Sequence, residues 1–319
     1  MCEAIASMDN RILISFVVVT RDRQNDLREC LKSISEQNYQ FFEVLVIDNA
    51  SSDKTTEIVQ RDFSFAKLIT LDRNLGCPGG RNIGILNSRG EILFFLDDDC
   101  RITVDATDNM IQLFEDDQSL GIVAPQIIEY GQPKDPPGCQ NRQQIKRYVP
   151  NFIGMAAIKR SVFEVNGLYP MEFLYGAEES DLSLRLLNNN GRILYTPDVK
   201  VIHFPSANRN TNWDMQQGLV NSVTVFWKYA PVSRALAASI GKPLKYFSVA
   251  LRTKSLLGWL KGIGYLPFAI FKTIRTHRHQ IGWYPFMLQE YLSQKIITSW
   301  DQAKPELFSK SWIRARMKL

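Results

Sequence analysis

Short apolar runs alternate with amphipathic segments through the first hundred residues. The runs at 12–20, 42–48, 67–72 and 91–99 are brief and rich in branched side chains, and they predict buried strands. After the first run, helical spacing sets four residues on one face: Leu27, Cys30, Leu31 and Ile34. A polar turn and a glycine-rich stretch then lead into two further predicted helices. Strands that alternate with helices predict an α/β fold with a doubly wound, mostly parallel sheet.

Polar residues follow these strands at the point where each one ends. Thr20 and Arg21 end the first strand, Asp48 and Asn49 the second, and three aspartates at 97–99 the fourth. Sheets of this kind bind ligands beyond the carboxyl ends of their strands. We therefore expect these side chains to gather on one ligand-binding edge.

The second half of the chain changes character twice. Residues 125–150 are rich in Pro, Gly, Gln and basic residues, which predicts a mobile surface loop. A helix is predicted from the acidic stretch 177–186, and an extended segment runs from 192 to His203. Beyond Pro205, helical, aromatic and basic residues dominate.

Three adjacent carboxylates at a strand end repel one another, and they persist most easily when a cation neutralises them. Strand alternation predicts Asp97 and Asp99 on one side and Asp98 on the other. One divalent ion could then contact Asp97 and Asp99, and oxygen ligands favour Mg²⁺ or Mn²⁺ over Zn²⁺. The alternative is a solvated acidic strand end; the position at the sheet edge favours the metal site.

Three further features are candidates for chemistry. The glycine stretch at 74–84 fits neither common nucleotide-binding glycine pattern. It permits close backbone approach, with Arg81 available for an anion, or else it is only a tight turn with close helix packing. Glu178, Glu179 and Asp181 cluster at a helix start, where they either complement the helix dipole or supply a general base. His203 becomes a candidate only if its strand end reaches the metal.

Taken in order, these segments resemble the family 2 glycosyltransferases, inverting enzymes of the GT-A fold. The resemblance covers roughly residues 12–205 and rests on FVVVTRDRQNDLRECLKSI, VLVIDNASSDKT, NLGCPGGRNIGI, ILFFLDDDC, GLYPMEFLYGAEESDLSLRL and VIHF. It implies a Rossmann-like, mostly parallel sheet flanked by helices. It also implies a nucleotide-sugar donor, and leaves UDP-, GDP- and dTDP-sugars open.

The resemblance further implies a role for each matching residue. The donor would be bound by Thr20, Arg21, Asp48, Asn49, Arg81, Asp97 and Asp98. Asp97 and Asp99 would form the Asp-X-Asp pair that holds Mg²⁺ or Mn²⁺, with His203 near the ion. Glu179 aligns with the catalytic base, which takes a proton from the acceptor hydroxyl in one inverting displacement. That position is commonly Asp, so Glu178 and Asp181 remain alternatives.

Charge divides the chain into two regions. The net charge is +5 overall, but residues 1–204 carry −8 and residues 205–319 carry +13. We predict a GT-A catalytic domain at 1–205, with nucleotide-sugar binding at about 12–100 and the acceptor and base part at about 150–205. A helical, basic region follows at 206–319. Its cations recur among apolar and aromatic residues, which favours amphipathic helices on an anionic membrane surface; the alternative is helices packed on the core.

Cysteine usage and the N-terminus bear on location. The five cysteines are scattered without a C-x-x-C pair, and the first residues lack an apolar signal segment. Both features favour a cytoplasmic protein, and the basic helices add a peripheral place on the inner face of the plasma membrane. An acceptor that is a saccharide or is lipid-linked, in cell-surface polysaccharide or glycolipid synthesis, would suit that place.

Three other functions compete with sugar transfer. A nucleotidyltransferase is disfavoured, because no glycine-rich loop follows the first strand. A catalytically degenerate scaffold subunit that binds sugar nucleotides at the membrane stays open, because Glu stands where Asp is common. Nucleic-acid binding is disfavoured, because the aromatic residues of the basic region are embedded in apolar segments.

Overall fold

The computed structural model describes residues 11–131, 143–205 and 210–301. Within these residues, nine strands form one sheet in the order β3-β2-β1-β4-β8-β6-β9-β5, and β7 pairs with β9. The strands are β1 Ile14–Thr20, β2 Phe42–Asp48, β3 Ala66–Thr70, β4 Ile92–Asp97, β5 Cys100–Ile102, β6 Leu120–Glu129, β7 Arg147–Tyr148, β8 Ala156–Lys159 and β9 Arg192–His203. The helices are α2 Gln24–Ser35, α3 Thr55–Asp62, α4 Gly76–Asn87, α5 Ala106–Asp116, α7 Arg160–Asn166, α8 Glu178–Asn188, α9 Thr211–Tyr229, α10 Val232–Arg252, α11 Leu256–Thr276 and α12 Tyr284–Gln294.

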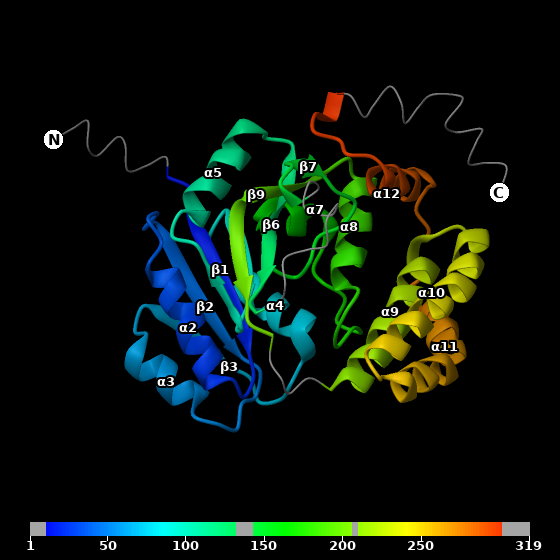
Figure 1. The fold of residues 1–319 in the computed structure, drawn as a ribbon, viewed down its shortest axis with the longest axis horizontal. Coiled ribbons are helices and arrows are strands. Elements are labelled where there is room, and N and C mark those ends of the chain that lie inside the picture. Colours follow the sequence, from blue (N-terminus) through cyan, green and yellow to red (C-terminus); the bar gives the residue numbers. More distant parts are fainter. Residues whose placement is uncertain (1–10, 132–142, 206–209, 302–319) are drawn as a thin grey trace.

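The first four strands are parallel and their ends are in register. Thr20 on β1 lies opposite Asp48 on β2, and Val19 lies opposite Asp97 on β4. Beyond β4 the sheet becomes mixed, because β8 runs antiparallel to both β4 and β6. Helices flank this sheet and further helices follow at the C-terminal side (Figure 1). The predicted α/β fold is confirmed, and its parallel strand ends meet at one edge.

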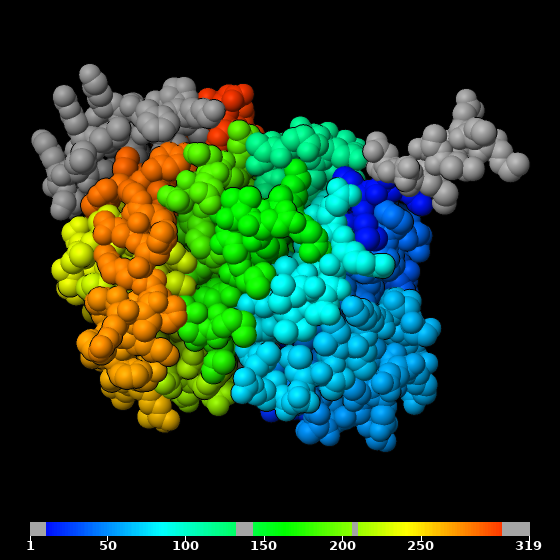
Figure 2. Space-filling view, turned by 180° about the vertical axis from the view of Figure 1, so that it is seen from behind, coloured from blue at the N-terminus to red at the C-terminus, as the bar shows by residue number. Residues whose placement is uncertain are grey.

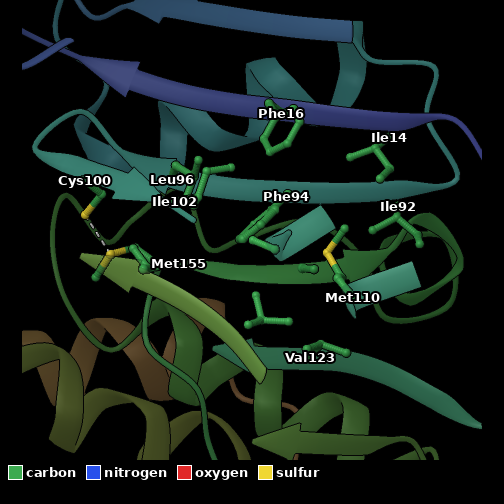
Figure 3. Packing of buried hydrophobic residues seen from close by; sticks show 14 of the residues in the cluster. Ile14, Phe16, Ile92, Phe94, Leu96, Cys100, Ile102, Met110, Val123 and Met155 are labelled. Carbon is green, nitrogen blue, oxygen red and sulfur yellow. Dashed lines mark hydrogen bonds between the residues drawn. The ribbon is translucent and has the colours of Figure 1, made fainter. Parts of the chain in front are cut away.

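Strand alternation fills an apolar layer on each face of the sheet. Phe16 and Phe94 stack at 5.6 Å between ring centroids in one layer, which α2, α3 and α5 cover (Figure 3). Val17 and Phe95 point into the other layer, which α4, α7 and α8 cover. Each fully buried Leu or Phe contributes about 1.5–3 kcal/mol, so the two layers hold the strand ends rigidly.

The predicted loop at 125–150 is wrong at its beginning. Residues 125–129 continue strand β6, which pairs with β9 as far as Glu129 opposite His203. Pro125 is tolerated because the register shifts between Pro125 and Gln126, where a missing N–H does not break the ladder. Residues 132–142 of the predicted loop lie outside the described residues.

The C-terminal helices pack in two ways. Helices α9, α10 and α11 form a group of their own beside the sheet domain (Figure 1). Helix α12 instead joins the core layer of Phe16, and the ring of Trp300 lies 5.0 Å from that of Tyr148. In the three described stretches of the chain, no helix has the length and apolar character that crossing a membrane requires.

Candidate active site

A cavity of about 720 Å³ opens at the carboxyl ends of β1, β2 and β4, which is the edge that the sequence predicts for a ligand. Segments from both halves of the chain line it, including the start of α9. Its lining contains Thr20, Arg21, Asn49, Arg81, Asp97, Asp98, Asp99, Glu178, Glu179 and His203. The fold thus brings ten of the predicted residues together, whereas Asp48 and Asp181 lie outside the lining.

The three aspartates differ from the alternation that the sequence predicts. Strand β4 ends at Asp97, so Asp98 and Asp99 form a turn into β5. The Asp97 side chain is 38% exposed and faces Arg81, whereas Asp98 and Asp99 share one nitrogen of Arg23 at 3.0 and 2.8 Å. Asp97 and Asp99 therefore do not share a face, because the strand geometry stops one residue too early.

Asp98 is held inside the protein. Thr20 donates its hydroxyl hydrogen bond to Asp98 at 2.7 Å. Burial raises the pKa of Asp98 to about 7, although Arg23 and Thr20 oppose the shift. Thr20 and Asp98 thus support the turn from within, and Asp97 and Asp99 remain the carboxylates that face outward or toward β9.

The end of β9 carries His203 to the acidic turn. The antiparallel pairing of β5 with β9 sets Cys100 opposite His203, and His203 Nε2 lies 3.3 Å from Asp99 Oδ1. The other ring nitrogen, Nδ1, lies 2.9 Å from a Glu129 carboxylate oxygen. Hydrogen bonding to Asp99, together with Glu129, raises the pKa of His203 to about 9. Glu129 fixes the ring orientation, as outer carboxylates do for metal-binding histidines.

These residues fit a hard divalent ion. Ligand atoms of Asp99, Cys100 and His203 lie within 4.8 Å of one another. Cys100, however, points into the apolar layer toward Met155 (Figure 3), and burial raises the pKa of its thiol far above the usual range. The remaining donors are carboxylate oxygens and one imidazole nitrogen, a set that suits Mg²⁺ or Mn²⁺ better than a soft ion.

Arg81 joins the aspartates to the second acidic group. It is 4% exposed, and its guanidinium lies 3.1 Å from Asp97, 3.3 Å from Glu178 and 3.4 Å from Glu179. Gly154 leaves room for it, since a Cβ there would stand 2.2 Å from an Arg81 nitrogen. The sequence predicts that Arg81 is available for an anionic ligand, but its guanidinium is instead paired with the protein's own carboxylates.

The glycine stretch packs helix α4 tightly on the sheet. A Cβ at Gly80 would stand 2.6 Å from Val19, and one at Gly84 2.3 Å from Val17. Asn49 fixes the loop before the helix, because its amide binds the backbone of Leu75 at 2.8 Å and of Gly76 at 3.0 Å. The close-packing alternative therefore explains these glycines, and Asn49 holds the loop at the cavity wall.

The two remaining candidates, Asp48 at the end of β2 and Asp181 on α8, have structural roles in this arrangement. Asp48 is buried and accepts a hydrogen bond from the backbone N–H of Ser51 at 3.0 Å. Asp181 is buried among cations, with Arg185 at 2.6 Å and Lys228 at 2.9 Å. Tyr229 also donates to Asp181 at 3.0 Å. Asp181 therefore ties α8 to α9 and does not reach the cavity.

Glu178 and Glu179 begin α8 at the cavity wall. Ala177, just before them, adopts a left-handed φ of 72°, a strained conformation of the kind found at functional sites. Burial raises the pKa of Glu178 to about 8 and raises that of Glu179, while Arg81 opposes both shifts. One Glu178 oxygen is buried without a hydrogen-bond partner among the described residues, whereas the Glu179 side chain is 16% exposed.

Sequence reasoning missed several cavity residues. Arg23 pairs with the carboxylates of the acidic turn. The only feature of the sequence that could have indicated this role is its position three residues beyond the end of the first strand. Glu129 lay within the stretch predicted to be a loop. Tyr175 and Trp213 form an aromatic pair at the wall, with ring centroids 5.6 Å apart. Trp213 belongs to α9, so only the folded chain reveals that it faces the cavity.

Comparisons with known proteins identify relatives of this chain. The family model Glycosyl transferase family 2 matches residues 15–167. An uncharacterized glycosyltransferase of Haemophilus influenzae is 27% identical over 189 residues, which are 55% of this chain and 62% of the relative. A GalNAc(5)-diNAcBac-PP-undecaprenol beta-1,3-glucosyltransferase of Campylobacter jejuni is 32% identical over 103 residues, covering 31% of this chain and 33% of the relative. The match thus spans less than two thirds of either relative.

A solved structure shares the fold over most of the chain. The mannosyltransferase PcManGT from Pyrobaculum calidifontis, in complex with GDP-Man and Mn²⁺, superposes with a TM-score of 0.57 at 21% identity. The superposition covers 84% of this chain and 88% of that one. This likeness establishes the GT-A fold. Together with this fold, the family match identifies residues 15–167 as a domain of the Glycosyl transferase family 2.

Proposed function

We propose that the protein is an inverting glycosyltransferase that moves a sugar from a nucleoside-diphosphate sugar to an acceptor hydroxyl. One observation carries the proposal: Arg81 contacts both the Asp97 carboxylate and the Glu178–Glu179 pair in a single cavity. A displacement of this kind needs a site for a departing diphosphate and a base for the incoming hydroxyl, held at fixed separation. The acidic turn of the cavity could hold a metal ion for the diphosphate, and the glutamate pair could supply the base.

In this proposal the diphosphate end is built by Asp99 and His203, and Asp97 lies on another face of the turn beside Arg81. Asp99 and His203 would hold Mg²⁺ or Mn²⁺, and such an ion would neutralise charge on the leaving diphosphate. The Mn²⁺ and GDP-Man bound by PcManGT support this assignment. Arg23 stays beside the acidic turn, where its guanidinium lowers the repulsion between Asp98 and Asp99. The donor would also contact Thr20, Arg21, Asn49 and Asp98, with Asp48 acting through the turn that it supports.

We assign the general base to Glu179. Its side chain is more exposed to the cavity than that of Glu178, and its raised pKa strengthens it as a proton acceptor once ionised. Glu178, with its pKa near 8, stays protonated at neutral pH and does not add a second negative charge. Arg81 orients both side chains. The proton of the acceptor hydroxyl would pass to Glu179 as that oxygen attacks the anomeric carbon.

The acceptor would enter beside Tyr175 and Trp213. Tilted aromatic rings offer an apolar face to a sugar ring, and both residues line the same cavity as Glu179. Residues 1–205 would then form the catalytic domain, and the helical region at 206–319 would complete its acceptor side. The undecaprenol-linked substrate named for the Campylobacter relative supports a saccharide or lipid-linked acceptor.

Melting temperatures test the donor site. UDP, GDP and dTDP would each be added with Mn²⁺, with Mg²⁺ and with chelator, because a ligand of the native state stabilises it by about 2.7 kcal/mol at a hundred times its Kd. We expect one nucleotide to raise the melting temperature only with metal, and Asp99→Ala to abolish the shift. If no nucleotide shifts folded protein, the transferase is ruled out. Nucleotide binding without any sugar transfer would instead favour the degenerate scaffold.

A further inference from the structure

Helix α11 buries mostly small residues along its middle line and leaves several large apolar residues exposed. The side packed on α9 consists of Gly258, Gly262, Leu266, Ala269 and Thr273. The contact is close, since a Cβ at Gly258 would stand 2.0 Å from the backbone oxygen of Asn212. The small residues thus let α11 approach α9 closely, with Leu266 filling the space between the helices.

The opposite side of α11 carries the bulky apolar residues. Leu257, Leu260, Phe268 and Phe271 are 54–60% exposed. Their spacing of three, eight and three residues keeps them within one stripe of the helix. A helix in water normally turns such side chains toward the core, because each costs about 1.5–3 kcal/mol when exposed. In α11 these four large apolar side chains point away from the core instead, which is expected where the outer side of a helix meets an apolar medium.

Helix α10 also exposes a stripe of large apolar residues. Leu236, Ile240, Leu244, Phe247 and Leu251 follow one another at intervals of three or four residues, and each is 39–67% exposed. Such spacing makes a continuous stripe along the helix. Figures 1 and 2 both show α10 and α11 at the edge of the molecule away from the first strands of the sheet.

Charge around these stripes has one sign. Residues 215–289 contain ten Lys or Arg and no Asp or Glu. Lys261 lies four residues after Leu257, and Lys272 four after Phe268, so each cation stands at the edge of the α11 stripe. Both lysines are exposed. Apolar side chains bordered by cations match the interface of a bilayer with anionic headgroups.

We propose that the outer face of α10 and α11 binds the surface of an anionic lipid bilayer. The apolar stripes would enter the interface between headgroups and acyl chains, and the bordering lysines would contact lipid phosphates. Because α11 is packed on α9 along its other side, it meets the bilayer with one face only. The absence of acidic residues from 215–289 favours this partner, since a complementary protein would have to supply all the negative charge.

The first turn of α11 is tied to the start of α9, which lines the cavity. The backbone N–H of Gly258 donates to the side-chain oxygen of Asn212 at 2.9 Å, and Asn212 precedes the cavity residue Trp213. The N-terminal end of α11 is therefore connected through Asn212 to the cavity wall, while the exposed stripe lies on the other side of the helix. If the proposed function is correct, a lipid-linked acceptor would reach the cavity without leaving the bilayer.

Flotation with vesicles tests this surface on the full chain. Vesicles of neutral phosphatidylcholine alone would be compared with vesicles containing phosphatidylglycerol, at low and high salt. We expect binding that requires the anionic lipid and weakens with salt. Lys261→Gln with Lys272→Gln should weaken it about 25-fold, at about five-fold for each cation. Phe268→Ser with Phe271→Ser should weaken it at least tenfold.

Matched controls come from the sheet domain. Leu86 on α4 is 67% exposed and the Arg61 side chain on α3 is 68% exposed, so Leu86→Ser and Arg61→Gln change similar groups elsewhere. Both should bind like the unaltered protein, and melting curves of every variant establish that it is folded. Nucleotide binding in solution should be unchanged in all variants, which separates this inference from the proposed function.

Two results would overturn the inference. One is vesicle binding that is absent, or equal for neutral and anionic lipid and for all variants. The other is a dimer in light scattering that the Phe268→Ser, Phe271→Ser variant dissociates while vesicles capture neither protein; the stripes would then be an interface between copies of the chain.

Discussion

Replacing Arg81 with methionine tests how the cavity is held together. The guanidinium is buried and contacts carboxylates at 3.1, 3.3 and 3.4 Å. At about 3.3 Å and an effective dielectric constant of about 20, each pair is worth about 5 kcal/mol before desolvation is subtracted. Breaking a buried pair by removing one partner leaves a net loss of about 3–5 kcal/mol. We expect Arg81→Met to lose that much stability at pH 8.5.

The loss should depend on pH. The pKa of Glu178 in the folded protein is about 8, above its ordinary 4.5, so its contribution to stability is present below pH 4.5 and disappears as the pH rises through 8. Without Arg81 this pKa rises further, and the ionised pair costs more. Denaturant unfolding at pH 5.5 and 8.5 should therefore give a smaller deficit for Arg81→Met at pH 5.5.

Arg160 provides the matched control. Its guanidinium binds the backbone oxygen of Gly90 at 2.7 Å and the hydroxyl of Ser88 at 2.9 Å, so its described hydrogen bonds go to neutral groups. Arg160→Met should destabilise the protein equally at both pH values. An Arg81→Met deficit below about 1 kcal/mol, or one that is the same at both pH values, would refute the electrostatic reasoning.

Three further changes address other parts of the molecule. Lys228→Met removes a buried cation that lies 2.9 Å from Asp181, and we expect denaturant unfolding to show a loss of about 3 kcal/mol; no loss would mean that this ion pair does not help to hold α9 to α8. Gly258→Ala should lower stability by about 1–3 kcal/mol because it forces α11 off α9, whereas Gly264→Ala, in open space, should raise it by up to about 1 kcal/mol; equal effects would contradict the close packing. Glu129→Ala frees the imidazole of the candidate metal site and should weaken Mn²⁺ binding by about 10–100-fold in calorimetry; unchanged affinity would remove Glu129 from that site.

Local pattern predicted the sheet edge well. Strand ends at Thr20, Asp48 and Asp97 are visible in the sequence because apolar runs stop abruptly there, and parallel pairing then aligns them. The buried face of α2 likewise follows from helical spacing. Such features depend on neighbours in the sequence, so the sequence alone carries them.

Contacts between distant strands and helices could not be predicted in the same way. His203 reaches Asp99 only because β5 pairs antiparallel with β9, and Asp181 forms an ion pair with Lys228 of α9. The predicted alternation of the three aspartate side chains between the two faces of the strand was wrong because the strand ends at Asp97. Each of these outcomes depends on tertiary pairing that no spacing rule contains.

In the proposed reaction, Glu179 takes the proton of the acceptor while the acidic turn holds the donor. The most direct measurement compares donor affinity and sugar transfer in Glu179→Gln, with Glu178→Gln as the neighbouring control. We expect Glu179→Gln to bind the donor nucleotide with unchanged Kd and to lose transfer by about 10²- to 10⁴-fold, and Glu178→Gln to lose far less. Transfer at the unaltered rate by Glu179→Gln would contradict the assignment.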